Sequence, residues 1–399
     1  MIGVDVAKWN HVAVAALDDG WMAKPERFTN DVEGFSALWR YCEEAVREVE
    51  RYTEFVVGFE PTGHYGEALA RWLSERGVKL FQVQPLHTKR AKELYDGTWR
   101  KTDAKDAALV ADLCRQGKAK PWRPPQGVFA ELRLLGRTRE QMVKRRSQVL
   151  NRVHRHVDVL FPELPKLFGK MDSPACLWWL RTVPTPEEVL AARRRTLIKG
   201  LHKASHHNLG EERVDALRAA AKRSVGIRDG ARGHRAVLMQ HLDELDQLTA
   251  SRCAIEAEMV GRLEQVDYAP NLLSIPRLGA TTTAILLGEF GDLRGYRHSR
   301  QLMSMAGLDL VEVSSGNKPA EDVEPSRIIS RRGRRYLRQV LYLASLRMGM
   351  DALAGPRARM LDAKVIPKKA VLANACRLVR VMHALVRDGA FFDAARIMS

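Results

Sequence analysis

The sequence lacks the features of a membrane protein, a disulfide scaffold or a zinc domain. No apolar run approaches the ~18–20 residues that a transmembrane helix needs. The first ten residues, "MIGVDVAKWN", contain no basic segment followed by an apolar one, so we expect no signal peptide. The five cysteines are scattered without close pairs: Cys42, Cys114, Cys176, Cys253 and Cys376. Neither a metal-binding nor a disulfide framework follows, and we expect a reducing cytoplasm and no membrane partner.

Negative charge is scarce relative to positive charge. The 399 residues include 65 Lys and Arg against 48 Asp and Glu, which gives a formal net charge of +17. The chain is long enough for two or three domains, and its 45% share of hydrophobic residues is sufficient for sizeable cores. Arg dominates the basic clusters, and its planar guanidinium suits phosphate. No basic amphipathic helix with Trp or Phe on its other face is visible, so we expect nucleic acid as the partner.

Residues 1–125 alternate between predicted strands and helices, which favours a mixed α/β sheet. Short apolar runs predict the strands, and apolar residues at helical spacing or a terminal glycine predict the helices. The expected strands are residues 1–7, 11–17, 54–60 and 78–85, and the expected helices are residues 31–50, 66–77 and 101–113.

After the Pro-rich segment 120–127 the chain turns helical. Two long amphipathic patterns, residues 129–160 and 234–266, predict an antiparallel coiled-coil pair within residues 126–268. Between them, Thr185 followed by Pro186 and Glu188 predicts a helix start with a capping box. The chain beyond is expected to fold as a mostly helical unit over residues 269–350, followed by a helical tail over residues 351–399.

Four acids stand where they could hold a metal. Asp5 and Glu60 each close a predicted strand, and Asp103 and Asp106 lie three apart at the start of a predicted helix, so they share one face. The simplest account of the last two is that carboxylates stabilise the positive end of a helix dipole. If all four converge, like-charge repulsion requires cations, and two Mg²⁺ ions with oxygen ligands would support phosphodiester cleavage.

The motifs that carry these acids resemble a known family. "GVDVAK", "FEPTGHYGEALARWL" and "KTDAKDAALVADL" are similar to the RuvC-like (RNase H-like) domain of the DEDD-type transposases of bacterial insertion sequences. "SIPRLGATTTAILLGEFGDL", "AGLDLVEVSSG" and "ISRRGRRYLRQVLYLAS" resemble the C-terminal transposase domain of the same family. The resemblance implies a RuvC-like catalytic domain in residues 1–125, a helical coiled-coil insertion and a C-terminal transposase domain. The implied acidic quartet is Asp5, Glu60, Asp103 and Asp106.

The resemblance also implies a serine nucleophile and a guide RNA. The family's serine falls on Ser315, with Ser314 as the alternative. A serine hydroxyl can form a covalent phosphodiester link to DNA that conserves bond energy until a new strand is joined. The implied protein is a bacterial, nucleoid-associated recombinase that joins element ends to target DNA under a structured bridge RNA. Strand exchange between two DNA molecules favours a homo-oligomer, either a dimer or a tetramer.

Clustered cations are the candidate contacts to nucleic acid. The predicted contacts lie on the first long helix and in the "RIISRRGRRYLRQ" segment: Arg137, Arg139, Lys144, Arg145, Arg146, Arg152, Arg327, Arg331, Arg332, Arg334, Arg335 and Arg338. The first group suits structured RNA and the second suits phosphates of DNA. Residues 275–290 resemble a helix-hairpin-helix whose second helix starts near Thr281, with Arg277 where such hairpins often have glycine.

Two other functions fit part of the pattern. A metal-dependent nuclease, such as a junction resolvase, would need the four acids but would tolerate loss of Ser314 or Ser315. A non-catalytic nucleic-acid-binding protein with a degenerate nuclease fold would need neither. His64 follows Glu60 closely and is a candidate for lining the site. His202, His206 and His207 have no accompanying Cys or carboxylate at ligand spacing, which favours surface or core histidines over a metal site.

Overall fold

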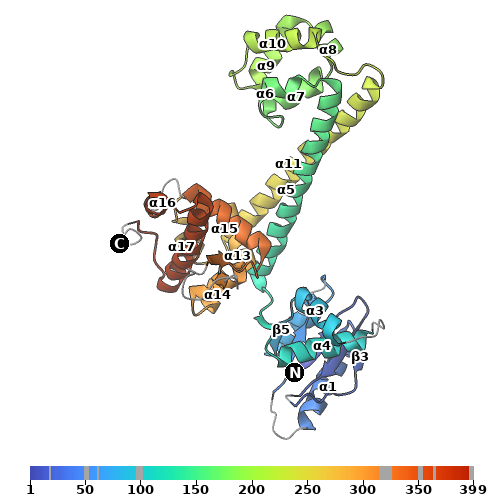
Figure 1. Ribbon diagram of the computed structural model, residues 1–399, viewed down its shortest axis with the longest axis vertical. Helices are drawn as coiled ribbons and strands as arrows, with labels where there is room; N and C mark the ends of the chain where they lie inside the picture. Colours follow the sequence, from blue (N-terminus) through green and yellow to red (C-terminus); the bar gives the residue numbers. More distant parts are fainter. Residues whose placement is uncertain are drawn as a thin grey trace, which may run out of the picture. The chain divides into compact units, whose positions relative to one another are not determined.

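A computed structural model describes residues 1–17, 19–48, 54–60, 63–95, 102–313, 326–348, 354–362 and 365–394. Contacts within the chain separate two compact units, Met1–Pro125 and Gln126–Ser399 (Figure 1). No helix in the described parts of the chain is both long and apolar enough to cross a membrane.

The first unit contains a six-stranded mixed sheet in the order β3-β2-β1-β4-β5-β6. Its strands are β1 (Ile2–Asp5), β2 (Asn10–Ala15), β3 (Glu26–Thr29), β4 (Val56–Phe59), β5 (Lys79–Gln82) and β6 (Lys120–Trp122). Strand β1 pairs antiparallel with β2 and parallel with β4, while β4 pairs parallel with β5. The expected mixed α/β class is confirmed. Strands β3 and β6 were not predicted, and Pro121 is tolerated because β6 lies at the sheet edge.

Helices cover both faces of this sheet. They are α1 (Val32–Arg47), α2 (Glu67–Glu75), α3 (Pro85–Tyr95) and α4 (Asp103–Arg115). Ile2 and Val4 of β1 share a core with apolar residues of α1 and α2. Because successive strand residues point to opposite faces, Gly3 and Asp5 point to the other face, on which α4 packs. Helix α4 therefore sits on the same side of the sheet as the strand-end acid.

The close approach of α4 depends on glycine at two strand positions. A Cβ atom on Gly3 would lie 2.2 Å from the carbonyl oxygen of Ala107, and one on Gly58 would lie 2.2 Å from Sγ of Cys114. The carbonyl oxygen of Ala107 is a backbone atom and cannot rotate away, whereas the Cys114 side chain can. Helix α4 is thus held against β1 more closely than any other residue type at position 3 would permit.

We expect Gly3→Ala to displace α4 and to destabilise the first unit by about 1–3 kcal/mol, because an added methyl group has no space to enter. Thermal unfolding followed by circular dichroism measures the loss. The matched control is Gly261→Ala, since a Cβ there meets nothing within 4 Å and alanine favours a helix. Equal melting of Gly3→Ala and the parent protein would contradict the packing described for α4.

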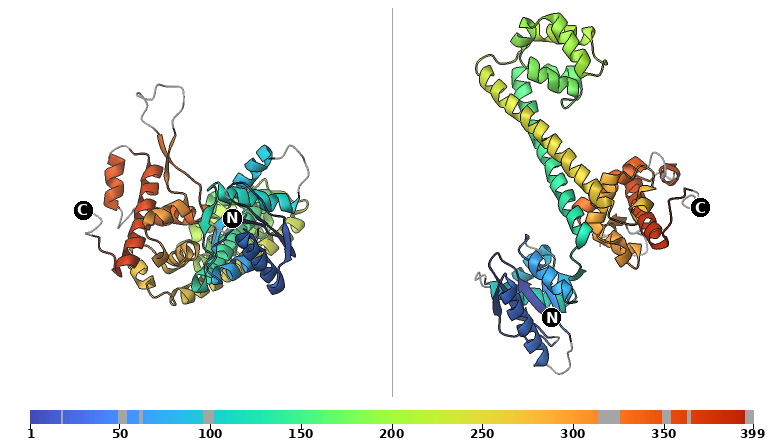
Figure 2. Two further views of the ribbon diagram at one scale, coloured as in Figure 1. Left: turned by 90° about the horizontal axis from the view of Figure 1, so that it is seen from below. Right: turned by 180° about the vertical axis from the view of Figure 1, so that it is seen from behind.

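The second unit is organised along two long helices, α5 (Gly127–Leu160) and α11 (Ala231–Leu263), which run side by side (Figures 1 and 2). Their direction follows from two ion pairs: Arg139 pairs with Glu256, and Arg145 pairs with Glu244. The partner with the higher residue number on α5 pairs with the lower residue number on α11, so the helices are antiparallel. The two predicted long helices are confirmed, whereas the supercoiled packing of a coiled coil stays a prediction.

Five short helices lie between α5 and α11 in the chain. They are α6 (Leu164–Phe168), α7 (Pro174–Thr182), α8 (Pro186–Ala191), α9 (Arg194–Ala204) and α10 (Glu211–Lys222). They share one hydrophobic core with Val149 and Val153 of α5 and with Leu238 and Leu242 of α11. The capping box predicted at Thr185 is confirmed, since its hydroxyl accepts from the backbone N–H of Glu188 and the Glu188 carboxylate accepts in return.

Most of the remaining elements pack into a second core around the other end of the long helices. The remaining elements are α12 (Ala269–Leu273), α13 (Ala280–Phe290), η1 (Leu293–Gly295), α14 (Ser299–Ala306), β7 (Leu310–Val313), β8 (Ser326–Ile329), α15 (Arg335–Met348), α16 (Ala354–Asp362) and α17 (Pro367–Asp388). Among the described residues, those of β7, β8 and α16 contribute nothing to this core. Helix α17 packs in the same core as α13 and α15. The expected unit over residues 269–350 is mostly helical, and it also contains the strands β7 and β8, which were not predicted and which pair antiparallel.

Candidate active site

Asp5 and Glu60 are neighbours at one end of the first-unit sheet. Asp5 is the last residue of β1, and Glu60 directly follows β4. The two strands run parallel with Val4 opposite Phe59, so the next residues along each strand are the two acids. Asp5 shares its face with Gly3, and the same alternation brings Glu60 to the face of Gly58. Both positions therefore face α4.

Asp103 and Asp106 occupy the first turn of α4. The helix begins there because the hydroxyl of Thr102 accepts from the backbone N–H of Lys105, which satisfies one of the unpaired donors of the first turn. Asp103 is exposed, whereas the Asp106 side chain is 15% exposed and pairs with Nζ of Lys92 at 2.7 Å. Lys92 belongs to α3, and sequence reasoning did not identify it.

The first turn of α4 lies over the strand that borders Asp5. Ala104 and Ala108 pack against Val12 of β2, and Val12 is the partner of Asp5 in the β1–β2 ladder. The fold thus brings strand ends and helix start to the same end of the sheet. In the residues that the structure describes, no three His, Cys, Asp or Glu side chains are grouped closely enough to hold a metal ion.

The candidate serines fall outside the part of the chain that is described. Ser314 and Ser315 directly follow β7, and the described chain resumes at β8. Their assignment therefore stays a prediction. Arg327 belongs to β8, but its side chain also lies outside the description.

Several predicted nucleic-acid contacts pair with carboxylates of the second unit. Arg137 and Arg334 both lie against the buried carboxylate of Glu289. The other pairs are Arg139 with Glu256, Lys144 with Glu140, Arg145 with Glu244 and Arg146 with Asp172. Burial lowers the pKa of the Arg334 guanidinium, and the nearby Glu289 opposes that effect. These cations therefore contribute to the fold, and their contact with nucleic acid stays a prediction.

Other predicted contacts are more accessible. Arg152 lies exposed on α5, and Arg331, Arg332 and Arg335 lie exposed before and at the start of α15. Arg338 instead donates to the backbone carbonyl of Ala306 at 2.9 Å. Exposed guanidinium groups can reach phosphate without breaking internal pairs.

The predicted hairpin around residues 275–290 has one feature that its sequence suggested. Arg277 adopts a φ of 64°, in the left-handed region that favours glycine. Helix-hairpin-helix segments often have glycine at this position. Helix α13 then begins at Ala280, one residue before the predicted start.

A cavity that sequence reasoning missed lies at the same end of the first-unit sheet as the acids. It has a volume of about 700 Å³ and is lined by residues that include Lys8, Trp9, Asn30, His64 and Tyr65. Lys8 and Trp9 follow Asp5 in the chain, and His64 and Tyr65 follow Glu60. Only His64 had been noted. A Trp four residues after a strand-end acid is the sequence signal that could have pointed to the cavity.

Comparison with known families agrees with the two sets of motifs. Residues 2–162 match the model of the DEDD transposases of IS110, described as "Transposase", and residues 269–359 match the "Transposase IS116/IS110/IS902 family". Together these matches cover well over half of the chain. The chain belongs to this DEDD family of insertion-element transposases, and it is a transposase.

Individual relatives extend the likeness along the chain. A 44.8 kDa protein of the insertion element IS116 from Streptomyces clavuligerus is 28% identical over 99% of this chain and 96% of its own length. A 43.6 kDa protein of IS110 from Streptomyces coelicolor is 26% identical over 80% of this chain and 78% of its own. The pilin gene-inverting protein of Moraxella bovis is 30% identical, over 37% of this chain and 45% of its own.

Membership of the DEDD family implies the use of a divalent metal. The side chains at the acidic end of the sheet fit that requirement in kind, since all four candidates are carboxylates and Mg²⁺ prefers oxygen ligands. The Asp106 carboxylate is paired with the Lys92 ammonium at 2.7 Å, so a metal ion at this position would have to displace Lys92 or share the carboxylate with it.

Proposed function

We propose that this transposase recombines an insertion element with target DNA through a covalent serine–DNA intermediate, under the direction of a structured RNA. The acidic quartet Asp5, Glu60, Asp103 and Asp106 would hold Mg²⁺, with two ions in the complete site. The observation that carries the proposal is that β1, β4 and the start of α4 bring these four positions to one end of the sheet. The sheet topology supports a RuvC-like catalytic domain.

The chemistry requires a nucleophile that stores the energy of the broken bond. The Ser315 hydroxyl, or that of Ser314, attacks a DNA phosphorus, and the bond from phosphorus to one strand oxygen breaks. The serine proton leaves, and the departing strand oxygen is protonated to a free hydroxyl. A hydroxyl of a different strand then reverses the reaction and releases the serine. Bound Mg²⁺ would supply charge stabilisation for the phosphoryl oxygens.

Charge supports double-stranded DNA and RNA as partners. The net charge of +17 favours polyanions, and Arg152, Arg331, Arg332 and Arg335 are exposed. We assign the long helix pair, as a coiled coil, to the structured guide RNA and to contacts between subunits of a dimer or tetramer. The Moraxella bovis relative bears a name that describes inversion of a gene, which agrees with a recombinase. We place the protein in the bacterial cytoplasm, at the nucleoid.

The direct test is a DNA–protein adduct. The full-length protein is incubated with Mg²⁺, end-labelled DNA from the element ends and RNA transcribed from the flanking non-coding segment, and the products are separated on a denaturing gel. We expect an adduct that Ser315→Ala, or Ser314→Ala, abolishes. Ser251→Ala, an exposed serine of α11, serves as the matched control and should keep the adduct.

The two competing functions give different gels. Cleaved DNA without an adduct, in the parent protein and in both serine variants, would identify a metal-dependent nuclease. Bound but uncut DNA under all conditions would identify a non-catalytic binding protein. Either result would overturn the serine mechanism.

A further inference from the structure

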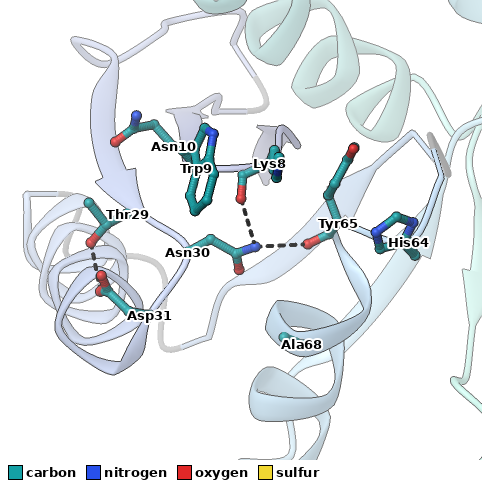
Figure 3. Close-up of a pocket in the computed structure, with 9 residues that line it drawn as sticks. All are labelled: Lys8, Trp9, Asn10, Thr29, Asn30, Asp31, His64, Tyr65 and Ala68. Atoms are coloured by element: carbon teal, nitrogen blue, oxygen red, sulfur yellow. Dashed lines mark hydrogen bonds between the residues drawn. The ribbon is translucent and has the colours of Figure 1, made fainter.

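The pocket beside the acidic end of the sheet has the chemistry of a base-stacking site. Two of its walls are the turn after β1 with Lys8 and Trp9 and the turn before α2 with His64 and Tyr65, and residues 29–31 form a third (Figure 3). The side-chain amide of Asn30 joins the first two walls by donating to the backbone carbonyls of Lys8 at 3.3 Å and Tyr65 at 3.4 Å. The Asn30 side chain thus holds the two walls together.

Trp9 is the most unusual residue of this wall. It is 71% exposed, although burying an aromatic ring of this size is normally favourable. Nζ of Lys8 lies 4.5 Å from the centroid of its ring, which places a cation next to an aromatic surface. Across the pocket the rings of His64 and Tyr65 are 4.4 Å apart. Aromatic faces with an adjacent lysine are the elements with which proteins hold single-stranded nucleic acid.

The position of the pocket identifies the strand that would enter it. Trp9 lies four residues after Asp5, and Tyr65 lies five residues after Glu60, so both walls extend from the strands that carry acids. A DNA strand with its phosphate at those acids has its neighbouring bases within reach of this end of the sheet. A volume of about 700 Å³ is sufficient for a nucleobase.

We infer that the pocket receives one unpaired base of the DNA strand, stacked on Trp9, next to the phosphate that is cleaved. Lys8 then faces the adjoining phosphate, and His64 with Tyr65 forms the opposite wall. The inference rests on the proposed function for the identity of the strand, but its physical content is base stacking, which can be measured without catalysis. A base held outside the duplex would fix the register of the strand at the acids.

The test uses the full-length protein without metal, so that no strand is cut. Binding of fluorescent single-stranded DNA of about ten nucleotides is measured by anisotropy at one salt concentration, in parallel with RNA of the same sequence. The variants are Trp9→Ala and Trp9→Phe, with Trp21→Ala as the matched control, because Trp21 is an exposed tryptophan of the same unit outside the pocket. Thermal melting verifies that each variant is folded.

We expect Trp9→Ala to weaken DNA binding about 10-fold and Trp9→Phe about two- to three-fold, while Trp21→Ala binds as the parent does. A series of DNAs that each lack one base should contain one position whose loss weakens the parent about 10-fold and leaves Trp9→Ala unchanged. An equal effect of Trp9→Ala on RNA and DNA supports base stacking.

Three results would overturn the inference. If Trp9→Ala and Trp21→Ala bind DNA equally well, no base stacks on Trp9. If Trp9→Ala weakens binding of RNA only, the pocket binds the guide RNA and not the DNA strand. A change in oligomeric state of Trp9→Ala without a binding defect would make the pocket a protein interface. These three results test base stacking and not strand transfer. Absence of the serine–DNA adduct would overturn the proposed function and would not change the result of the stacking measurement.

Discussion

Asp103→Asn is expected to reduce cleavage and joining of element-end DNA at least about 1,000-fold, because metal-assisted charge stabilisation contributes several kcal/mol to such reactions. The substitution removes one carboxylate charge and keeps the shape of the side chain. Asp103 is exposed, so the fold loses only its interaction with the helix dipole, about 0.3–1 kcal/mol. Asp103→Asn should therefore lose most of its activity while its melting temperature changes little.

A matched control is available in the same unit. Glu33 is an acidic residue in the first turn of α1, as Asp103 is in α4, and it lies away from β1 and β4 in the chain. Glu33→Gln should melt as Asp103→Asn does and should retain full activity in the gel assay for labelled DNA. Activity of Asp103→Asn within a few-fold of the parent would show that this carboxylate holds no catalytic metal.

Glu289→Gln is expected to destabilise the second unit by about 3 kcal/mol, because it leaves two guanidinium groups beside a site that no longer carries their counter-charge. The Glu289 side chain is only 1% exposed. It accepts from Nε of Arg137 at 2.9 Å, and Nη1 of Arg334 lies 3.6 Å from its other oxygen. One carboxylate of α13 thus joins α5 to the segment before α15.

The expected shift in melting temperature is about 5 °C for a unit of this size, measured by scanning calorimetry. Glu258→Gln is the control, since Glu258 is 52% exposed and its pair with Arg262 should contribute less than about 1 kcal/mol. If both variants melt together, the Glu289 pairs do not stabilise the fold. The same pairing means that a binding defect in an Arg137 or Arg334 variant has to be compared with its melting temperature.

Local patterns predicted the elements that carry the acids. The first turn of α4, the strand ends at Asp5 and Glu60 and the capping box at Thr185 all depend on near neighbours in the chain, and each lies where expected. The common location of Asp5 and Glu60 at one end of the sheet also follows from sequence, because parallel strands present their carboxyl ends together.

Other features depend on partners that the sequence does not place. Helix α3 was missed because Pro85 was interpreted as a strand end, although proline also suits the first helical turn. The pairing of Arg137 with Glu289 spans 152 residues, and no local pattern indicates it. Strands β7 and β8 pair across residues 314–325, so neither is evident from its own short sequence. For the same reason the sequence did not indicate that some predicted phosphate contacts, such as Arg139 and Arg145, also form internal ion pairs.

The long helices of the second unit have a consequence for the spacing of whatever binds there. Helix α5 extends for about 50 Å, from 34 residues at about 1.5 Å each, and its two ends belong to different hydrophobic cores. Duplex DNA covers that length in about 15 base pairs. Two contacts to a double helix at opposite ends of α5 would therefore be roughly one and a half turns apart. The length of α5 sets this spacing, and the base sequence does not.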